Sequence, residues 1–153
     1  MKAPNTIWQH GTGAIIEHPG QALLLRHTGN ALRVVGVAGS TNWLHYPIQL
    51  QQRLATSAAH LLRILMRYRC DSPTALITNV MLYDAEVCVF KAAGLNLCAY
   101  EWDDIALAVD PELRVTHGLN LSIGIRFDGA DNDTHALEIS GVGVEIDDEK
   151  KPM

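Results

Sequence analysis

The chain has 153 residues, of which 48% are hydrophobic and 19% are charged. This balance is typical of a globular protein and too apolar for a disordered one, so we expect a single domain over residues 1–153. The formal net charge of −5 argues against a nucleic-acid partner, which would need a concentrated basic surface. The densest basic segment holds Arg63, Arg67 and Arg69 in alternation with apolar residues. We interpret it as one solvated strand face, with an anion-binding stripe as the alternative.

The first residues, 1–5, lack the apolar segment of a secretory signal peptide. No apolar run approaches the roughly 20 residues that a membrane-crossing helix needs. Cys70, Cys88 and Cys98 are widely spaced and form no CxxC pair, which predicts buried reduced thiols rather than disulfides or a zinc site. We therefore expect a cytoplasmic protein without a membrane partner.

Short apolar runs separated by turn residues fill the first third of the chain, a spacing typical of sandwiches and barrels. Residues 6–10 and 14–18 flank Gly11-Thr12-Gly13 and predict a hairpin. A strand that begins at Asn42 is expected to stop at Pro47. Further along the chain, strands are expected over 22–27, 31–37 and 42–46.

The segment from 50 to 70 carries two overlapping patterns. Apolar residues from Leu50 to Tyr68 recur at spacings of three and four, which fits an amphipathic helix, whereas residues 62–70 alternate as a strand. We expect a strand over 60–70, and a short helical segment near 50–58 stays open as an alternative.

Residues 119–127 carry the clearest pattern in the chain. Five apolar residues alternate there with small or polar ones, and a strand would bury all five on one face. They are Leu119, Leu121, Ile123, Ile125 and Phe127. A further strand is expected over 135–146, where the alternation changes phase at Gly141. A glycine at a phase change indicates a β-bulge.

These patterns together predict an all-β protein, an antiparallel β-sandwich of jelly-roll-like type. Residues 75–83 and 87–90 flank Asp84-Ala85-Glu86 and predict a second hairpin. Residues 105–109 predict another strand. The acidic tail, 147–153, is predicted to be flexible.

Several segments resemble motifs of one group of small, uncharacterised bacterial proteins. They are Trp8-Gln9-His10-Gly11, Asn42-Trp43-Leu44-His45-Tyr46-Pro47-Ile48, the run from Ile77 to Asp84, Gly94-Leu95-Asn96-Leu97 and the run from Gly118 to Ile125. The resemblance covers most of the chain in the same order, and it implies a β-sandwich with a strand at 60–70. The chain departs from the group at Met81, where the group has a histidine, and in extra length around 50–59. Because the group has no assigned activity, the resemblance implies no catalytic residues.

The sequence motifs of common enzymes and metal sites are missing. The seven histidines are isolated, and no HxH, HExxH or HxxxH element joins any two of them, so we expect no metal and no other cofactor. No GxSxG element is present, and no catalytic residue is assigned. The carboxylates of 128–133 would suit calcium but lack EF-hand spacing, and we interpret them as a polar turn.

The candidate ligand-binding residues are aromatic and histidine side chains near predicted turns. They are Trp8, His10, Trp43, His45, Trp102 and His117. A tryptophan at a loop end can stack on a ligand or anchor a partner, and filling the end of the core is the alternative. Asp103 and Asp104, beside Glu101 and Trp102, would suit acid–base catalysis with an aromatic platform for a sugar. Exposed loop carboxylates explain this run equally well.

We expect a non-catalytic binding or assembly module whose ligand is a small molecule or a carbohydrate. Unpaired edge strands promote association, so a homo-oligomer is expected, most simply a symmetric dimer. The alternative is a small enzyme with His45 or His117 beside a carboxylate, in a barrel mouth or between the sheets. A structural component of a larger assembly is the second alternative.

Overall fold

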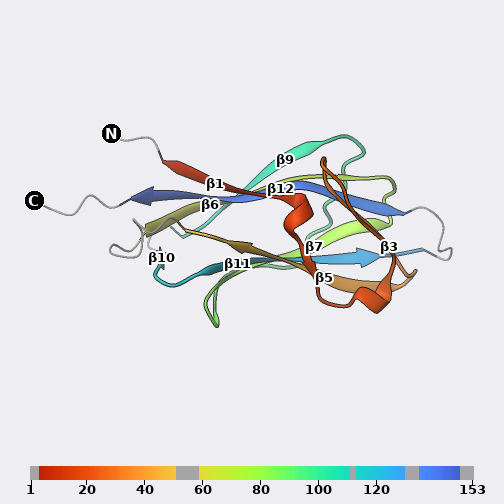
Figure 1. The fold of residues 1–153 in the computed structure, drawn as a ribbon, viewed down its shortest axis with the longest axis horizontal. Coiled ribbons are helices and arrows are strands. Elements are labelled where there is room, and N and C mark those ends of the chain that lie inside the picture. Colours follow the sequence, from red (N-terminus) through yellow and green to blue (C-terminus); the bar gives the residue numbers. More distant parts are fainter. Residues whose placement is uncertain (1–3, 51–58, 111–112, 130–134, 149–153) are drawn as a thin grey trace, which may run out of the picture.

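In a computed structural model, which describes residues 4–50, 59–110, 113–129 and 135–148, two antiparallel sheets lie face to face over one apolar core (Figure 1). This confirms the jelly-roll-like sandwich. The five-stranded sheet contains β2 (Ile15–Ile16), β5 (Ser40–Ile48), β7 (Ala75–Asp84), β8 (Val87–Ala92) and β11 (Leu119–Phe127). The seven-stranded sheet contains β1 (Asn5–His10), β3 (Ala22–His27), β4 (Leu32–Gly36), β6 (Ala59–Cys70), β9 (Asp103–Ala108), β10 (Arg114–Val115) and β12 (Ala136–Asp148).

The five-stranded sheet has the order β2-β5-β11-β7-β8. In the seven-stranded sheet the long strands β6 and β12 form the centre. β1 and β4 share one edge of β12, and β9 and β10 share the opposite edge of β6. Two 3₁₀ turns, η1 (Gly11–Gly13) and η2 (Pro19–Gln21), complete the elements. No helix in the described ranges is long and apolar enough to cross a membrane.

β11 is the middle strand of its sheet, and it has the bounds that the alternation predicts. Its five alternating apolar side chains are all buried against the other sheet, because successive side chains on a strand point to opposite faces. The even-numbered residues of β11 therefore face outward. Two of these outward residues, Asn120 and Ser122, line a hollow on the outer face of the sheet.

The predicted hairpin around Gly11-Thr12-Gly13 is wrong. β1 pairs with β12 in the seven-stranded sheet, whereas β2 pairs with β5 in the other sheet, so η1 carries the chain across the edge of the sandwich. The buried hydroxyl of Tyr46 donates to the carbonyl oxygen of Gly11 at 3.0 Å and holds this crossing. Alternation predicts which residues face the core, but it does not specify the partner strand.

The expectation that β5 stops at Pro47 is wrong. β5 continues to Ile48, and Pro47 lies opposite Asn120 of β11. On the other side of β5, β2 begins at Ile15, opposite His45, and pairs from there toward Leu44. At Pro47 the strand therefore has a partner on one side alone, where the missing N–H of proline is tolerated.

Two further predictions concern β12. A bulge at the phase change is confirmed, because Ser140 has no partner between Ile139, opposite Tyr68, and Gly141, opposite Arg67. The tail begins later than expected, since Asp147 still pairs with β6 and the strand ends at residue 148.

Residues 149–153 and the possible helical segment at 51–58 lie outside the described residues. The strand at 60–70 is confirmed as β6.

The three cysteines differ in how far their side chains are exposed to solvent. Cys70 on β6 is buried, as expected, and Cys98 is partly buried. Cys88 is exposed, so the expectation of a buried thiol is wrong there. It lies on β8, the edge strand of the five-stranded sheet, where a side chain has a neighbouring strand on one side alone. All three thiols are free.

Candidate functional site

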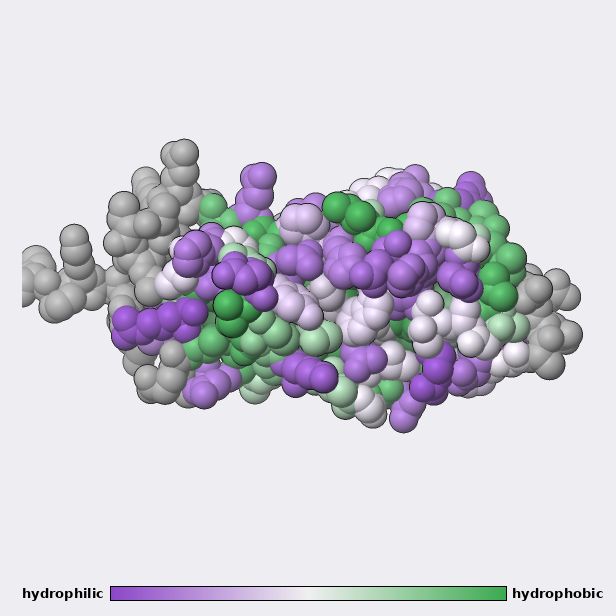
Figure 2. Space-filling model, turned by 90° about the horizontal axis from the view of Figure 1, so that it is seen from below, coloured by the Kyte–Doolittle hydropathy of each residue, from purple (hydrophilic) through white to green (hydrophobic). Residues whose placement is uncertain are grey.

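A hollow of about 620 Å³ lies on the outer face of the five-stranded sheet. Figure 2 views the molecule from the side of this sheet, and hydrophilic and weakly polar side chains occupy much of its centre. The apolar and aromatic lining residues are Trp43, Met81, Tyr83 and Ala85. The polar lining residues are Glu17, His45, Asn79, Lys91, Asn120 and Ser122.

Strand register explains why these residues meet. The outward residues of β11 lie between outward residues of β5 and β7. Ser122 is opposite His45 on one side and Met81 on the other, and Gly124 is opposite Trp43 and Asn79. A bulge at Thr78 of β7 follows directly, and bulges of this kind commonly re-aim side chains beside binding sites.

Gly124 lies between Trp43 and Asn79, which both line the hollow. A Cβ added to this glycine would lie 3.0 Å from Cβ of Asn79 and 3.2 Å from Cη2 of the Trp43 ring. These distances are shorter than ordinary van der Waals contact, so the ring and the amide approach the backbone because residue 124 has no side chain. Trp43 is half-buried and forms one wall of the hollow.

A chain of polar side chains crosses the sheet beside Trp43. Nδ2 of Asn120 donates to Oγ of Ser122 at 3.0 Å, and Oγ of Ser122 lies 2.8 Å from Nδ1 of His45. Because Ser122 accepts from Asn120, its hydroxyl hydrogen is free to be donated to Nδ1 of His45. Nε2 of His45 faces Oε1 of Glu17, 3.8 Å away. The chain orients the imidazole toward the hollow.

Buried Asn42 positions Glu17. Its side-chain oxygen accepts from the backbone N–H of His18 at 3.0 Å, and its amide nitrogen donates to the carbonyl oxygen of His18 at 2.8 Å. The backbone N–H of Glu17 also donates to the carbonyl oxygen of Trp43 at 2.9 Å. These bonds fix the segment that follows β2 along β5, so the Glu17 carboxylate stays at the rim.

The β7–β8 turn closes another side of the hollow, and Asp84 holds the neighbouring segment. Its carboxylate accepts from the backbone N–H groups of Thr116 and His117, each at 2.9 Å, and from the Thr116 hydroxyl at 3.2 Å. Burial alone would raise the pKa of Asp84, but these hydrogen bonds hold it below its ordinary value. The next residue, Ala85, lines the hollow and donates its N–H to the carbonyl oxygen of Gly118 at 2.8 Å.

The six predicted site residues do not gather in one place. Trp43 and His45 line the hollow together. Trp8 and His10 lie on β1, in the opposite sheet, and His10 accepts from the N–H of Thr12 at 3.1 Å. Trp102 packs against arginines of β6 in the same opposite sheet, with Cζ of Arg69 4.9 Å from its ring centroid. His117 is exposed beside Asp84 and does not line the hollow.

Sequence reasoning missed most of the lining residues. Asn120 and Ser122 occupy the polar positions of the alternation at 119–127, and Asn79, Met81 and Tyr83 alternate in the same way on β7. The residues that could have indicated the site were therefore the outward-facing residues of two predicted strands. Glu17 and Lys91 carried no such signal.

The described residues contain no group of three or more His, Cys, Asp or Glu side chains placed to hold a metal ion. The hollow instead combines aromatic faces with amide, hydroxyl, imidazole and charged groups. This combination can bind a ligand that has both apolar faces and many hydroxyls.

The sandwich shares its fold with carbohydrate-binding modules of known structure. The xylan-binding module CBM15 matches with a TM-score of 0.58 at 14% identity, over 96% of this chain and 99% of that chain. A family 35 carbohydrate binding module from Clostridium thermocellum matches with a TM-score of 0.51 at 10% identity, over 92% and 97%. A CBM4 structure matches with a TM-score of 0.50 at 10% identity, over 88% and 86%. At these identities the likeness is one of fold.

The chain belongs to a family of unknown function, DUF6623, whose sequence model matches residues 2–149. This agrees with the resemblance of its motifs to an uncharacterised group. No curated protein matches the chain.

Proposed function

We propose that the protein is a non-catalytic module that binds a carbohydrate chain in the hollow of the five-stranded sheet. The observation that carries this proposal is the partly exposed Trp43 ring against Gly124, with the polar chain from Asn120 to Glu17 beside it. A sugar ring presents C–H groups on its face and hydroxyls around its edge. The C–H groups suit the electron-rich face of an indole, and the hydroxyls suit amide, imidazole and carboxylate partners.

The dimensions and the fold support the same ligand class. A volume of about 620 Å³ falls within the range of about 300 to 1,000 Å³ that is usual for small-molecule sites. The solved structures that share the fold include a protein described as a xylan-binding module. Those proteins support a carbohydrate as the ligand at the level of fold, and the geometry of the hollow supports it at the level of residues.

The same geometry favours binding over glycoside hydrolysis. Hydrolysis normally needs two carboxyl groups on either side of the glycosidic bond, roughly 5 to 9.5 Å apart. Among the lining residues that the structure describes, Glu17 is the single carboxylate. Its neighbour His45 takes part in the chain with Ser122 and Asn120, which suits a hydrogen-bonding role toward a sugar hydroxyl.

Native gel electrophoresis in gels that contain soluble xylan, barley β-glucan or galactomannan tests the proposal. We expect at least one polysaccharide to retard the wild-type protein, and we expect Trp43→Ala to lose most of that retardation while Trp43→Phe keeps part of it. Tyr100→Ala is the matched control, because Tyr100 is 63% exposed and lies outside the hollow. Equal retardation of wild type and Trp43→Ala, or none of the wild type in any gel, would overturn the proposal.

We also propose that the chain forms a homo-oligomer. β3 is an edge strand of the seven-stranded sheet, and its Leu23 and Leu24 are 49% and 38% exposed. Free backbone groups and exposed apolar side chains on an edge favour pairing with a second copy. Light scattering across micromolar concentrations tests this, and a constant mass of one chain would contradict it.

A further inference from the structure

On the opposite sheet, a second tryptophan, Trp8, packs against two glycines of β12, Gly141 and Gly143. Trp8 of β1 is opposite Gly143 of β12 and points away from the core. A Cβ added to Gly143 would lie 3.1 Å from Cε3 of the indole, and one added to Gly141 would lie 3.5 Å from the same atom. The six-membered part of the ring therefore lies over the backbone of both glycines. Trp8 is nevertheless 54% exposed, so its other face meets solvent.

Trp8 borders a hollow of about 510 Å³. We call it the Trp8 hollow; its lining includes Trp8, Gln9, His10, Arg67, Asp104 and Gly141. The bulge at Ser140 lies at its edge, and a third hollow begins on the far side of Arg67, toward Trp102. An aromatic platform and several hydrogen-bonding groups thus surround one concave surface.

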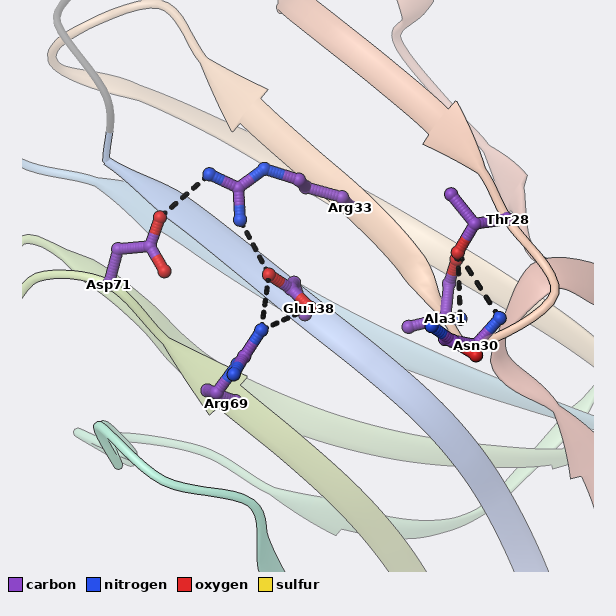
Figure 3. Close-up of polar contacts among 7 residues, drawn as sticks. All are labelled: Thr28, Asn30, Ala31, Arg33, Arg69, Asp71 and Glu138. Atoms are coloured by element: carbon purple, nitrogen blue, oxygen red, sulfur yellow. Dashed lines mark hydrogen bonds and ion pairs between the residues drawn. The ribbon is translucent and has the colours of Figure 1, made fainter.

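The charges beside the Trp8 hollow are balanced. Arg67 donates to Asp104 at 2.7 Å, across the β6–β9 register. Further along β6, Arg69 donates to Glu138 at 3.0 Å, and Glu138 also accepts from Arg33 (Figure 3). Arg67 and Arg69 are exposed to solvent in part, as expected for a solvated strand face. Their pairing with carboxylates argues against the anion-binding stripe. A neutral ligand with many hydroxyls fits such a surface better than an anion does.

We propose that the Trp8 hollow is a second saccharide-binding site, so that one chain binds two glycan segments on its opposite faces. The inference rests on the proposed function for the class of ligand, and it adds a separate site on separate strands. Both sites share one construction, a tryptophan on one strand lying over glycine on the next, and this construction leaves a flat ring open to a sugar face. Two sites on opposite faces would cross-link polysaccharide chains and raise the apparent affinity for a polymer.

The experiment compares wild type, Trp8→Ala, Trp43→Ala and the double variant in the same three polysaccharide gels. We expect each single variant to bind roughly tenfold more weakly than wild type, as for the loss of an aromatic anchor, and the double variant to bind no polysaccharide. Trp8→Phe should recover part of the binding. Urea unfolding of each variant shows whether a loss of polysaccharide binding comes from misfolding.

The outcomes separate the two proposals. If Trp8→Ala equals wild type while Trp43→Ala loses all retardation, the second site is overturned and the first stands. If Trp43→Ala equals wild type while Trp8→Ala loses all retardation, the first site is overturned and the second stands. No retardation of wild type in any gel overturns both.

A direct readout is the indole N–H region of a ¹H–¹⁵N spectrum, in which three tryptophans give three signals that single variants assign. Titration with xylohexaose, or with the oligosaccharide of whichever polysaccharide retards the protein, should shift the Trp8 and Trp43 signals with separate saturation curves. A Trp8 signal that stays unchanged at saturation of Trp43 overturns the second site. So does a Trp8 signal that responds to protein concentration instead of sugar, because Trp8 would then be a contact between copies.

Discussion

The ring of Trp43 and the backbone of Gly124 touch across β5 and β11, and a Cβ on Gly124 would lie 3.2 Å from Cη2 of the indole. The same Cβ would lie 3.0 Å from Cβ of Asn79 on β7. The absence of one side chain in the middle strand thus sets the shape of the hollow from both sides.

Gly124→Ala should weaken polysaccharide binding about five- to tenfold, because the new methyl group displaces Trp43 or Asn79 by a few tenths of an ångström. We expect the free energy of unfolding to fall by about 1 kcal/mol, because the higher strand preference of alanine offsets part of the crowding cost of about 1 to 3 kcal/mol. Gly20→Ala is the matched control, since a Cβ there meets nothing within 4 Å. Retardation of Gly124→Ala equal to that of Gly20→Ala would show that the missing side chain at residue 124 does not shape the site.

Asp84 should give stability that depends on pH. Its folded-state pKa lies below the ordinary value, so its contribution is fully present above the unfolded pKa of about 3.9 and is lost as the pH falls through the lower, folded pKa. Asp84→Asn should therefore cost roughly 1 to 2 kcal/mol at pH 7 and progressively less below about pH 4. Urea unfolding of both proteins from pH 7 to pH 2.5 measures the difference, and a difference constant over that range would contradict this account.

The three cysteines should differ in their reaction with an aromatic disulfide reagent. Cys88 is exposed and should react first, in a phase that Cys88→Ser removes. Cys70 is 1% exposed, and burial raises the pKa of its thiol to about 12, so little thiolate forms at pH 8. Its reaction should require unfolding, and a Cys70 reaction as fast as that of Cys88 would show that β6 opens readily. Absorbance of the released thiolate, with and without urea, gives the measurement.

Ala85→Gly should stabilise the fold. Ala85 is the first residue of the two-residue β7–β8 turn and has a φ of 51°, a conformation that costs an L-residue roughly 1 to 2 kcal/mol and glycine almost nothing. The greater freedom of glycine in the unfolded chain offsets part of the gain, so we expect a net increase of about 0.5 to 1 kcal/mol in the free energy of unfolding. Glu86→Gly is the control, and it should lower stability because φ is not positive at Glu86. Thermal unfolding that ranks the two variants in the opposite order would contradict the turn geometry.

The site was partly predictable from the sequence. Trp43 and His45 were identified as candidates from their position beside a turn, and both line the hollow. Asn120 and Ser122 lay in the polar half of the clearest alternation, but an exposed polar residue on a strand is too common to mark a site by itself. His117 was a candidate for the same reason as His45, and it lies beside Asp84 instead.

An antiparallel sandwich was predictable from the residue pattern, because a period of two is a local property that reports which side chains of each strand face the core. It also placed β11, β6 and the bulge before Gly141. The folded molecule was needed to show that β1 pairs with β12 rather than β2. It was also needed to show that Trp43 lies near Gly124 and Asn79, and Trp8 near Gly143. Pairing joins strands far apart in the chain, and it depends on which neighbours bury the most apolar surface together. No local pattern contains that choice, and both hollows follow from it.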